Sequence, residues 1–311
     1  MALRTIFRMC SVVTGLRNCG VPRKMAAEKM GLFTTHDRSI SSLDDYASLR
    51  EHFMQFKGGS VDLVKDNETG IAVITLNNPD VKNAMTGKMM ADLYDTVGDL
   101  EVWNAGKGVI LRGSGTTFCS GGDLGTVRQI CNQANGIKMS VFMHNITSRL
   151  LQIPMISVAT IQGTALGGGA ELTTACDFRL MTQGARIGFV QIKLGVLTGW
   201  GGGTRLTKLL GKSKALEVLA SGKMYDSKEA KSIGLINDIL PDDSDPEDSA
   251  NEWLNRFCCW DPAAVSYTKS IVSVAERSPY EHALSFEREC FSDVWGKPVH
   301  LNALNRNIKH S

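Results

Sequence analysis

Two glycine-rich turns are the stretches of this chain with the clearest capacity for chemistry. Residues 117–124 contain Gly121 and Gly122, and residues 162–172 contain three consecutive glycines, Gly167 to Gly169. Because glycine lacks a Cβ, another molecule can approach its backbone closely, and N–H groups at a helix start are free to face it. One N–H from each turn could converge on a single oxygen and stabilise an enolate by roughly 3 kcal/mol per donor. The alternative is that the glycines only let a strand and a helix pack tightly.

Other catalytic and binding motifs are incomplete or absent in the sequence. Gly211-Lys212-Ser213 matches the end of a phosphate-binding loop, but Leu206 stands where that motif needs its first glycine. Neither a dinucleotide-binding G-x-G-x-x-G nor a G-x-S-x-G nucleophile elbow occurs. The six histidines show no ligand spacing, and the eight cysteines form no C-x-x-C. The sequence therefore predicts no metal site and no cofactor.

The composition is that of a globular protein with nearly balanced charge. The chain has 311 residues, of which 43% are apolar, and a formal net charge of +2. It can form one large domain or two smaller ones. The charge balance gives no reason to expect binding to nucleic acid or to a membrane surface, and no apolar run approaches the roughly 20 residues of a membrane span. Scattered cysteines favour a reducing compartment.

Apolar spacing predicts alternating strands and helices from about residue 60 onward. The predicted strands cover 61–64, 71–76, 108–111, 155–161, 177–181, 186–190 and 235–240. The predicted helices cover 86–100, 139–153, 171–176, 204–210, 214–221 and 227–233. Thr86 and Asp226 are residue types that cap helices, and Pro154 ends the second helix.

The domain organisation follows from these elements. We expect residues 1–59 to be a basic, poorly ordered lead-in, residues 60–260 to form the core, and residues 261–311 to be a helical C-terminal region. Residues 1–28 contain five basic residues and no acidic residue before Glu28, a composition similar to that of a mitochondrial transit peptide. A merely disordered basic segment is the alternative. The C-terminal helices have more apolar faces than so short a region can bury, which predicts assembly into an oligomer.

Both glycine turns resemble those of the enoyl-CoA hydratase/isomerase (crotonase) superfamily. The resemblance rests on Phe118–Leu124 and Gly163–Leu172, and it extends over about residues 60 to 295. Asn83-Ala84, Ala175–Arg179 and Gly202–Leu206 support it. The resemblance implies an α/β spiral of repeated β-β-α units with a helical C-terminal trimerisation region. It also implies an acyl-CoA thioester as substrate and a homotrimer or dimer of trimers.

The resemblance also assigns the site residues by position. The oxyanion N–H donors fall on Gly122 and Gly168, and Glu171 takes the place of the first catalytic glutamate of the hydratases. Further expected contacts to the substrate are Lys82, Asn83, Ala84, Asp123, Leu124, Gln191 and Trp200.

One departure from the family pattern changes the expected reaction. Gln191 stands where the hydratases have a second glutamate, and an amide cannot exchange a proton with water as a carboxylate does. Trp200-Gly201-Gly202 together with residues 170–182 resembles family members that decarboxylate malonyl-type thioesters, which implies a short branched substrate such as ethylmalonyl-CoA or methylmalonyl-CoA. The neutral amide agrees with this, because it would not repel a carboxylate on the substrate. Trp200 could form an apolar wall that destabilises the departing carboxylate, or it could be ordinary core. Glu171 could orient the reacting carbon or relay a proton, or it could merely complement a helix dipole.

Three alternatives and one question of compartment accompany this expectation. The chain could be a hydratase or isomerase of the same fold, a non-catalytic acyl-CoA-binding member, or an RNA-binding member. The resemblance implies the cytosol, whereas the basic N-terminus is typical of a protein of the mitochondrial matrix, and we favour the cytosol.

Overall fold

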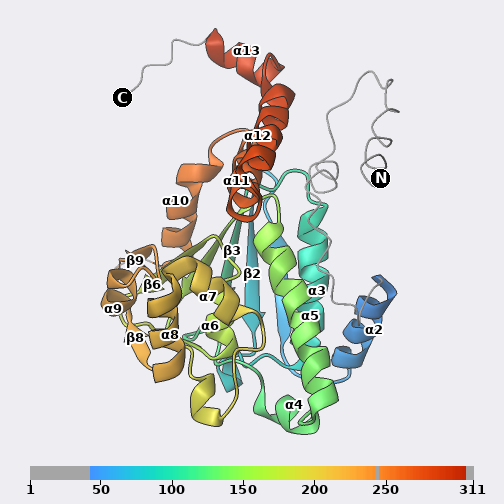
Figure 1. Ribbon diagram of the computed structural model, residues 1–311, viewed down its shortest axis with the longest axis vertical. Helices are drawn as coiled ribbons and strands as arrows, with labels where there is room; N and C mark the ends of the chain where they lie inside the picture. Colours follow the sequence, from blue (N-terminus) through green and yellow to red (C-terminus); the bar gives the residue numbers. More distant parts are fainter. Residues whose placement is uncertain (1–42, 242–244, 306–311) are drawn as a thin grey trace, which may run out of the picture.

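The computed structural model describes residues 43–241 and 245–305, and its centre is a six-stranded sheet (Figure 1). The strand order is β1-β2-β3-β4-β6-β9, with β1 antiparallel to β2 and the other neighbours parallel. These strands are β1 (Ser60–Lys65), β2 (Ile71–Asn77), β3 (Gly108–Gly113), β4 (Ile156–Ile161), β6 (Phe178–Thr182) and β9 (Asp238–Leu240). The hairpin predicted from the sequence is confirmed, since Val61 pairs with Leu76.

A second, three-stranded sheet lies beside the first and receives the chain as it leaves β4. It has the order β5-β7-β8 and consists of β5 (Thr164–Leu166), β7 (Arg186–Gly188) and β8 (Met224–Asp226). The chain passes repeatedly from a strand of the large sheet to a strand of the small one and then into a helix. This is the spiral of strand–strand–helix units that the sequence predicted.

Helices enclose both faces of the large sheet (Figure 1). The helices are α2 (Leu43–Met54), α3 (Gly87–Glu101), α4 (Leu124–Gln129), α5 (Gln133–Gln152), α6 (Gly168–Thr173), α7 (Gly202–Leu210), α8 (Lys212–Ser221), α9 (Ser227–Ser232), α10 (Pro246–Cys258), α11 (Pro262–Arg277), α12 (Tyr280–Val294) and α13 (Pro298–Leu304), with 3₁₀ turns η1 (Pro79–Val81) and η2 (Gln191–Leu194). Among the described residues, no helix combines the length and the apolar character needed to cross a bilayer.

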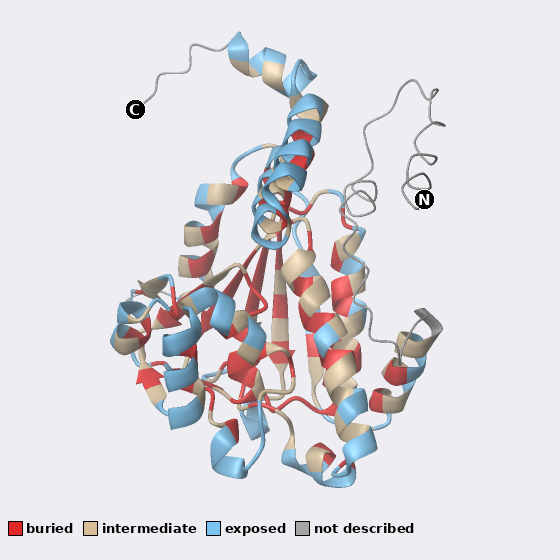
Figure 2. Cartoon of the chain, viewed as in Figure 1, coloured by how far each residue is buried: buried red, intermediate tan, exposed pale blue. Residues whose placement is uncertain are grey.

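Strand β2 shows how the sheet divides the core into two layers. Its side chains alternate, so Ala72 and Ile74 join the main apolar cluster with α3 and α5. Ile71 faces the other way, into a second cluster closed by Leu254 and Cys258 of α10. Figure 2 shows the strands as the most continuously buried part of the chain.

The expectation that residues up to 59 are a poorly ordered lead-in is wrong for residues 43–59. Residues 43–54 form α2, in which Leu49 and Phe53 are buried. The Phe53 ring stacks on Phe142 of α5 at 5.4 Å between centroids. The helix escapes detection because its core-facing side chains, Tyr46, Leu49 and Phe53, are interspersed with many charged and polar residues. Residues 1–42, including the basic N-terminus, lie outside the described residues.

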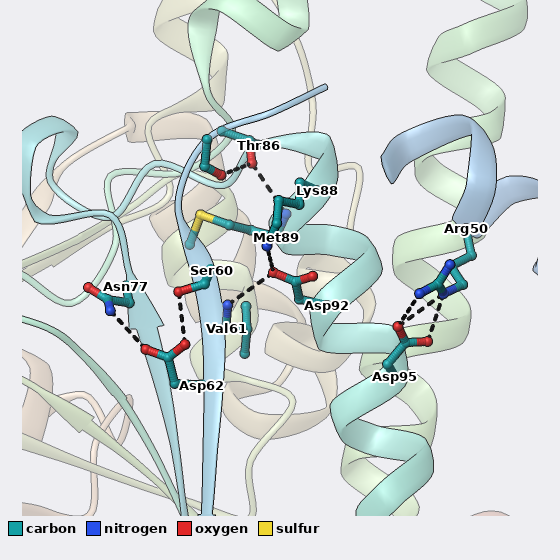
Figure 3. A network of polar contacts seen from close by, with 11 residues as sticks. Arg50, Ser60, Val61, Asp62, Asn77, Thr86, Lys88, Met89, Asp92 and Asp95 are labelled. Atoms are coloured by element: carbon teal, nitrogen blue, oxygen red, sulfur yellow. Dashed lines mark hydrogen bonds and ion pairs between the residues drawn. The ribbon is translucent and has the colours of Figure 1, made fainter. Parts of the chain in front are cut away.

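Polar contacts fix the start of the core to α2 and α3 (Figure 3). Arg50 donates from Nε and Nη2 to the carboxylate of Asp95, at 2.8 and 2.6 Å. Thr86 caps α3 as predicted, because its Oγ1 accepts from the N–H of Met89 at 3.2 Å and donates to the Gly58 carbonyl at 2.6 Å. The connection from α2 through residue 59 is therefore part of the folded body.

Other helix boundaries follow their capping residues. Asp226 and Glu229 form a capping box at α9, which confirms the predicted cap. Helix α5 begins six residues before the predicted start, at Gln133, because the Asn132 side chain accepts from the N–H of Asn135. The last strand of the large sheet is shorter than the predicted 235–240 and covers Asp238–Leu240.

The C-terminal helices α11 to α13 project from the sheet, at the top of Figure 1. Helix α11 is attached through Lys269, whose Nζ lies 2.7 Å from Asp177 Oδ2 and donates to the Met155 carbonyl at 2.8 Å. Figure 2 shows much of this region in pale blue, as exposed residues. Large apolar side chains are among them, including Tyr280, Phe291, Trp295, Leu301 and Leu304.

Candidate active site

The two glycine turns predicted to act together lie side by side. Cys119 pairs with Ala165 as a parallel bridge, and the N–H of Leu166 donates to the Cys119 carbonyl at 2.9 Å. A Cβ placed on Gly121 would lie 3.3 Å from the nitrogen of Gly168. The spacing therefore lets atoms of both turns contact one small group.

Gly122 and Gly168 are the glycines of the two turns that combine access with free N–H groups. In the described part of the chain neither N–H donates a hydrogen bond. Both residues are partly exposed, whereas Gly121, Gly167 and Gly169 beside them are buried. Helix α6 begins at Gly168, three residues before the predicted start, and its six residues give only a short dipole behind this N–H.

Trp200 covers both glycines with its indole ring. A methyl group on Gly168 would lie 2.5 Å from Trp200 Cζ3, so no larger residue fits there while the ring keeps its place. A methyl group on Gly122 would lie 3.8 Å from Cζ2. The ring is 2% exposed and joins the main apolar cluster, so it is both core and a wall of the candidate site.

Glu171 is buried one helical turn after Gly168, with N–H donors around its carboxylate. Its Oε1 accepts from Gln191 Nε2 at 2.9 Å and from the N–H of Gly199 at 3.2 Å. Its Oε2 accepts from the N–H groups of Trp200 and Gly202, both at 2.8 Å. Burial raises the pKa of Glu171, and these hydrogen bonds oppose that rise.

Gln191 is nine-tenths buried and directs its side-chain amide at Glu171. Because a carboxylate only accepts, the Gln191 nitrogen must be the atom that faces it. The Gln191 Oε1 is then left without a partner in the described residues. The structure thus places an uncharged donor beside Glu171, where a second carboxylate would have created a like-charge pair.

Arg205 is a member of this site that sequence reasoning missed. Its guanidinium donates to the Trp200 carbonyl at 2.8 Å, the Glu171 carbonyl at 3.1 Å and Thr147 Oγ1 at 3.0 Å. Burial lowers the pKa of Arg205 to about 10, and the charge of Glu171 opposes this. The only signal was its place in the Gly202–Leu206 motif, because an arginine in a predicted helix is ordinarily read as exposed.

The expected substrate contacts at residues 82–84 form a tight turn before the first glycine turn. Lys82 and Asn83 have positive φ angles of 57° and 54°. Asn83 is fully buried, and its amide donates to the carbonyls of Ser114 and Thr117 at 2.9 and 2.6 Å. Asn83 therefore organises the loop, Lys82 is exposed beside it, and Ala84 is buried.

Asp123 and Leu124 lie directly after Gly122. Asp123 caps α4 by accepting from the N–H of Thr126 at 2.7 Å. Leu124 is 56% exposed at the surface next to the turn. Among the described residues, no three His, Cys, Asp or Glu side chains gather as a metal site would require.

Comparison with known proteins places this geometry in a family. A sequence model described as Enoyl-CoA hydratase/isomerase matches residues 66–300. The chain belongs to the enoyl-CoA hydratase/isomerase family. Solved structures of the family share the fold: an enoyl-CoA hydratase from Bacillus anthracis has 27% identity and a TM-score of 0.73, with 80% of this chain and 95% of that one covered. One from Geobacillus kaustophilus has 25% identity and a TM-score of 0.74, with 80% and 93% covered.

Curated members of the family with higher identity carry a different name. "Ethylmalonyl-CoA decarboxylase" of Gallus gallus is 43% identical over 267 residues, covering 85% of this chain and 89% of that protein. The proteins of the same name from Mus musculus and Homo sapiens are 44% and 42% identical, covering 83% and 84% of this chain and 80% and 85% of theirs.

Proposed function

We propose that this protein is a carboxy-lyase that decarboxylates short branched malonyl-CoA thioesters, with ethylmalonyl-CoA as the principal substrate and methylmalonyl-CoA as a second. The observation that carries the proposal is a difference in similarity within the family. Relatives named as ethylmalonyl-CoA decarboxylases are 42–44% identical over more than four fifths of the chain, whereas the solved hydratases named above are 25–27% identical.

In the proposed reaction the thioester carbonyl oxygen sits between the N–H groups of Gly122 and Gly168. The bond between the α-carbon and the carboxylate breaks and CO₂ leaves. The electron pair of that bond stays on the α-carbon and delocalises onto the thioester oxygen, which forms the enolate. The two N–H groups stabilise the negative oxygen, each by roughly 3 kcal/mol. A proton then replaces CO₂ on the α-carbon, so the products are CO₂ and the saturated acyl-CoA, without oxidation or reduction.

The surroundings of the reacting carbon support loss of CO₂ over addition of water. An ionised carboxylate held against the Trp200 ring is poorly solvated, and its departure as neutral CO₂ relieves that cost. Gln191 is neutral and its Nε2 is engaged with Glu171, so the pair lacks the second carboxylate that two-carboxylate hydration needs.

The proposal extends to the assembly, the compartment and the chemistry needed. The reaction uses no metal, biotin or nucleotide, because the two N–H groups carry the charge of the enolate. The apolar side chains exposed on α11 to α13 support a homotrimer or a dimer of trimers. The protein acts in the cytosol, with the mitochondrial matrix as the alternative that the basic N-terminus favours.

A small panel of CoA thioesters tests the proposed activity. The purified protein is incubated with ethylmalonyl-CoA, methylmalonyl-CoA and crotonyl-CoA, with and without a chelator, and products are identified by mass. We expect the two malonyl-type thioesters to lose CO₂ at rates that the chelator leaves unchanged, and crotonyl-CoA to remain intact. Hydration of crotonyl-CoA without any decarboxylation would overturn the proposal. Light scattering and cell fractionation test the assembly and the compartment.

A further inference from the structure

The Glu171 carboxylate has the hydrogen-bond environment of an ionised acceptor. A carboxylate offers about four lone-pair sites, and four N–H groups at 2.8 to 3.2 Å fill them. A protonated carboxyl would point its O–H at one of these donors, and two donors facing each other lose a hydrogen bond. The geometry therefore fits the charged form better than a form that stores a proton.

Three of the four donors come from one short turn, residues 199–202, which carries Trp200. The carbonyl groups of the same turn are also held. Ser140 Oγ donates to the Gly199 carbonyl at 2.8 Å, and Arg205 donates to the Trp200 carbonyl. Gly202 packs directly against Glu171, since a methyl group there would overlap Glu171 Cγ.

The position of the 199–202 turn determines where the indole ring of Trp200 lies. The ring contacts the α-carbon side of Gly168 and lies near Gly122, the residues assigned to the thioester oxygen. Any shift of the turn would move the ring relative to both N–H groups. It would also change the space beside them, where the branch of the acyl group must lie.

We propose that Glu171 is a positioning residue, and that as a carboxylate it clamps the 199–202 turn so that Trp200 covers the two glycines and limits the size of the acyl branch. The proposal rests on the decarboxylase function proposed above. It replaces the expectation that Glu171 relays the proton to the enolate.

The pH dependence of turnover separates a clamp from a proton relay by its sign. A clamp needs the ionised form, so kcat falls as the pH drops through the pKa of Glu171. A proton donor needs the protonated form, so kcat falls as the pH rises through it. Burial raises the pKa of this carboxyl, which moves either limb toward the neutral range.

Of the other ionisable groups near Glu171, Arg205 and Cys176 do not titrate in the acid range, whereas His144 takes up its proton there. Arg205 of α7 has a pKa of about 10 and stays charged. Burial, with Arg205 nearby, lowers the pKa of His144 on α5, so this imidazole is neutral at neutral pH. Burial raises the pKa of Cys176 to about 12 and keeps it a thiol.

A double-mutant cycle tests the clamp through Trp200. Glu171→Gln keeps the size of the side chain but turns one acceptor into a donor, which faces N–H groups. We expect this variant to change the ratio of kcat/KM for ethylmalonyl-CoA and methylmalonyl-CoA by about tenfold, the scale of one methylene in an apolar pocket. Trp200→Ala should change the ratio in the same direction. In the Trp200→Ala background, Glu171→Gln should then have little further effect.

The matched control is Gln191→Leu, which removes one donor and leaves the three backbone donors in place. It should shift the ratio in the same direction by less. Additive effects of Glu171→Gln and Trp200→Ala, an unchanged ratio, or an alkaline limb in the wild-type kcat profile would overturn the clamp.

The fluorescence of Trp200 provides a readout that does not need turnover. The difference between the emission of the wild type and of Trp200→Phe isolates the signal of Trp200. This signal should shift to longer wavelength in Glu171→Gln, because the indole ring becomes more exposed to solvent. If the wild type decarboxylates none of the thioesters but this shift occurs, the proposed function fails and the clamp stands. If Glu171→Gln does not fold, the wild-type pH profile and the Gln191→Leu ratio decide.

Discussion

Two acidic residues six positions apart, Glu171 and Asp177, are held in opposite ways. Within residues 43–241 and 245–305, the Glu171 carboxylate accepts only from uncharged N–H groups, three of them in a single turn. Asp177 faces a cation, the Lys269 ammonium of α11 at 2.7 Å, and its Oδ2 also accepts from the N–H and Oγ of Ser157. The first arrangement holds a turn of the candidate site, and the second fastens a C-terminal helix to the sheet.

The difference teaches what each site can tolerate. A carboxylate ringed by N–H groups depends on precise placement of a turn, so its loss should appear in the specificity of the enzyme. An ion pair between distant elements depends on the presence of both charges, so its loss should appear in the stability of the fold. Changes around Glu171 and around Asp177 should therefore differ in what they alter.

The largest effect is expected at Gly168, on the side of Glu171. Gly168→Pro removes the N–H assigned to the oxyanion and should lower kcat by roughly 10² to 10³. Gly168→Ala is the matched control, because it keeps the N–H but makes the same collision with Trp200. Steady-state kinetics on ethylmalonyl-CoA measures both. An equal loss in the two variants would assign the effect to the ring and remove the N–H from the mechanism.

Lys269→Met should act on the fold and leave the chemistry in place. It leaves the Asp177 carboxylate without its cation, and we expect a loss of about 3 kcal/mol in the free energy of unfolding, the lower end for a broken buried ion pair. The lower end applies because the Asp177 side chain keeps 22% of its surface exposed. Urea unfolding measures the loss, and Lys269→Met/Asp177→Asn should recover part of it. A changed ratio of the two substrates in the folded variant would contradict the separation of the two sites.

Gln191→Glu tests whether the site tolerates a second negative charge. The new carboxylate would face Glu171, raise the pKa of the pair and repel the carboxylate of the substrate. We expect kcat/KM at neutral pH to fall about tenfold, which corresponds to about one pKa unit of interaction. Activity should partly return as the pH is lowered and the pair takes up a proton. Unchanged decarboxylation at neutral pH would show that Gln191 does not act by avoiding charge repulsion with the substrate.

Ser157→Ala should cost less stability than Lys269→Met. It removes an uncharged hydroxyl that donates to Asp177 Oδ2 at 2.9 Å and accepts from the Asp177 N–H at 3.0 Å, while the Lys269 ion pair remains. The loss should be about 2 kcal/mol in unfolding free energy, from two hydrogen bonds of about 1 kcal/mol each. Turnover per folded molecule should not change. A loss as large as that of Lys269→Met would show that the hydroxyl, and not the cation, dominates this site.

The sequence predicts those parts of the fold that depend on local pattern. The alternation of β2, the Thr86 cap and the Asp226 cap depend on a few adjacent residues, and each is confirmed. Helix α2 was missed because its stability comes from Phe53 stacking on a ring 89 positions away, in α5. No local pattern records such a contact.

The candidate site divides in the same way. Gly122, Gly168 and Glu171 lie in continuous motifs, and in the structure Gly122 and Gly168 both lie against the Trp200 ring while Glu171 follows one helical turn later. The four donors around Glu171 come from the 3₁₀ turn η2 and from the 199–202 turn, both in the connection between β7 and α7. The buried Arg205 donates to atoms of α5, α6 and the Trp200 turn. Asn83 was expected at the substrate, but its side-chain amide donates to the carbonyls of Ser114 and Thr117 in a different loop. Loop-to-loop contacts of this kind depend on tertiary structure and leave no periodic trace.

Helix α2 restricts how the protein can be shortened at its N-terminus. Phe53 is fully buried against Phe142, and Arg50 is bound to Asp95, so α2 supplies part of the core. A truncated form that starts at β1 would expose the Phe142 ring and the apolar surface of α3 and α5 to solvent, a lesion that promotes aggregation and degradation. Any maturation protease that leaves a soluble product must therefore cut before Leu43. A protein expressed for crystallisation should likewise begin no later than that residue.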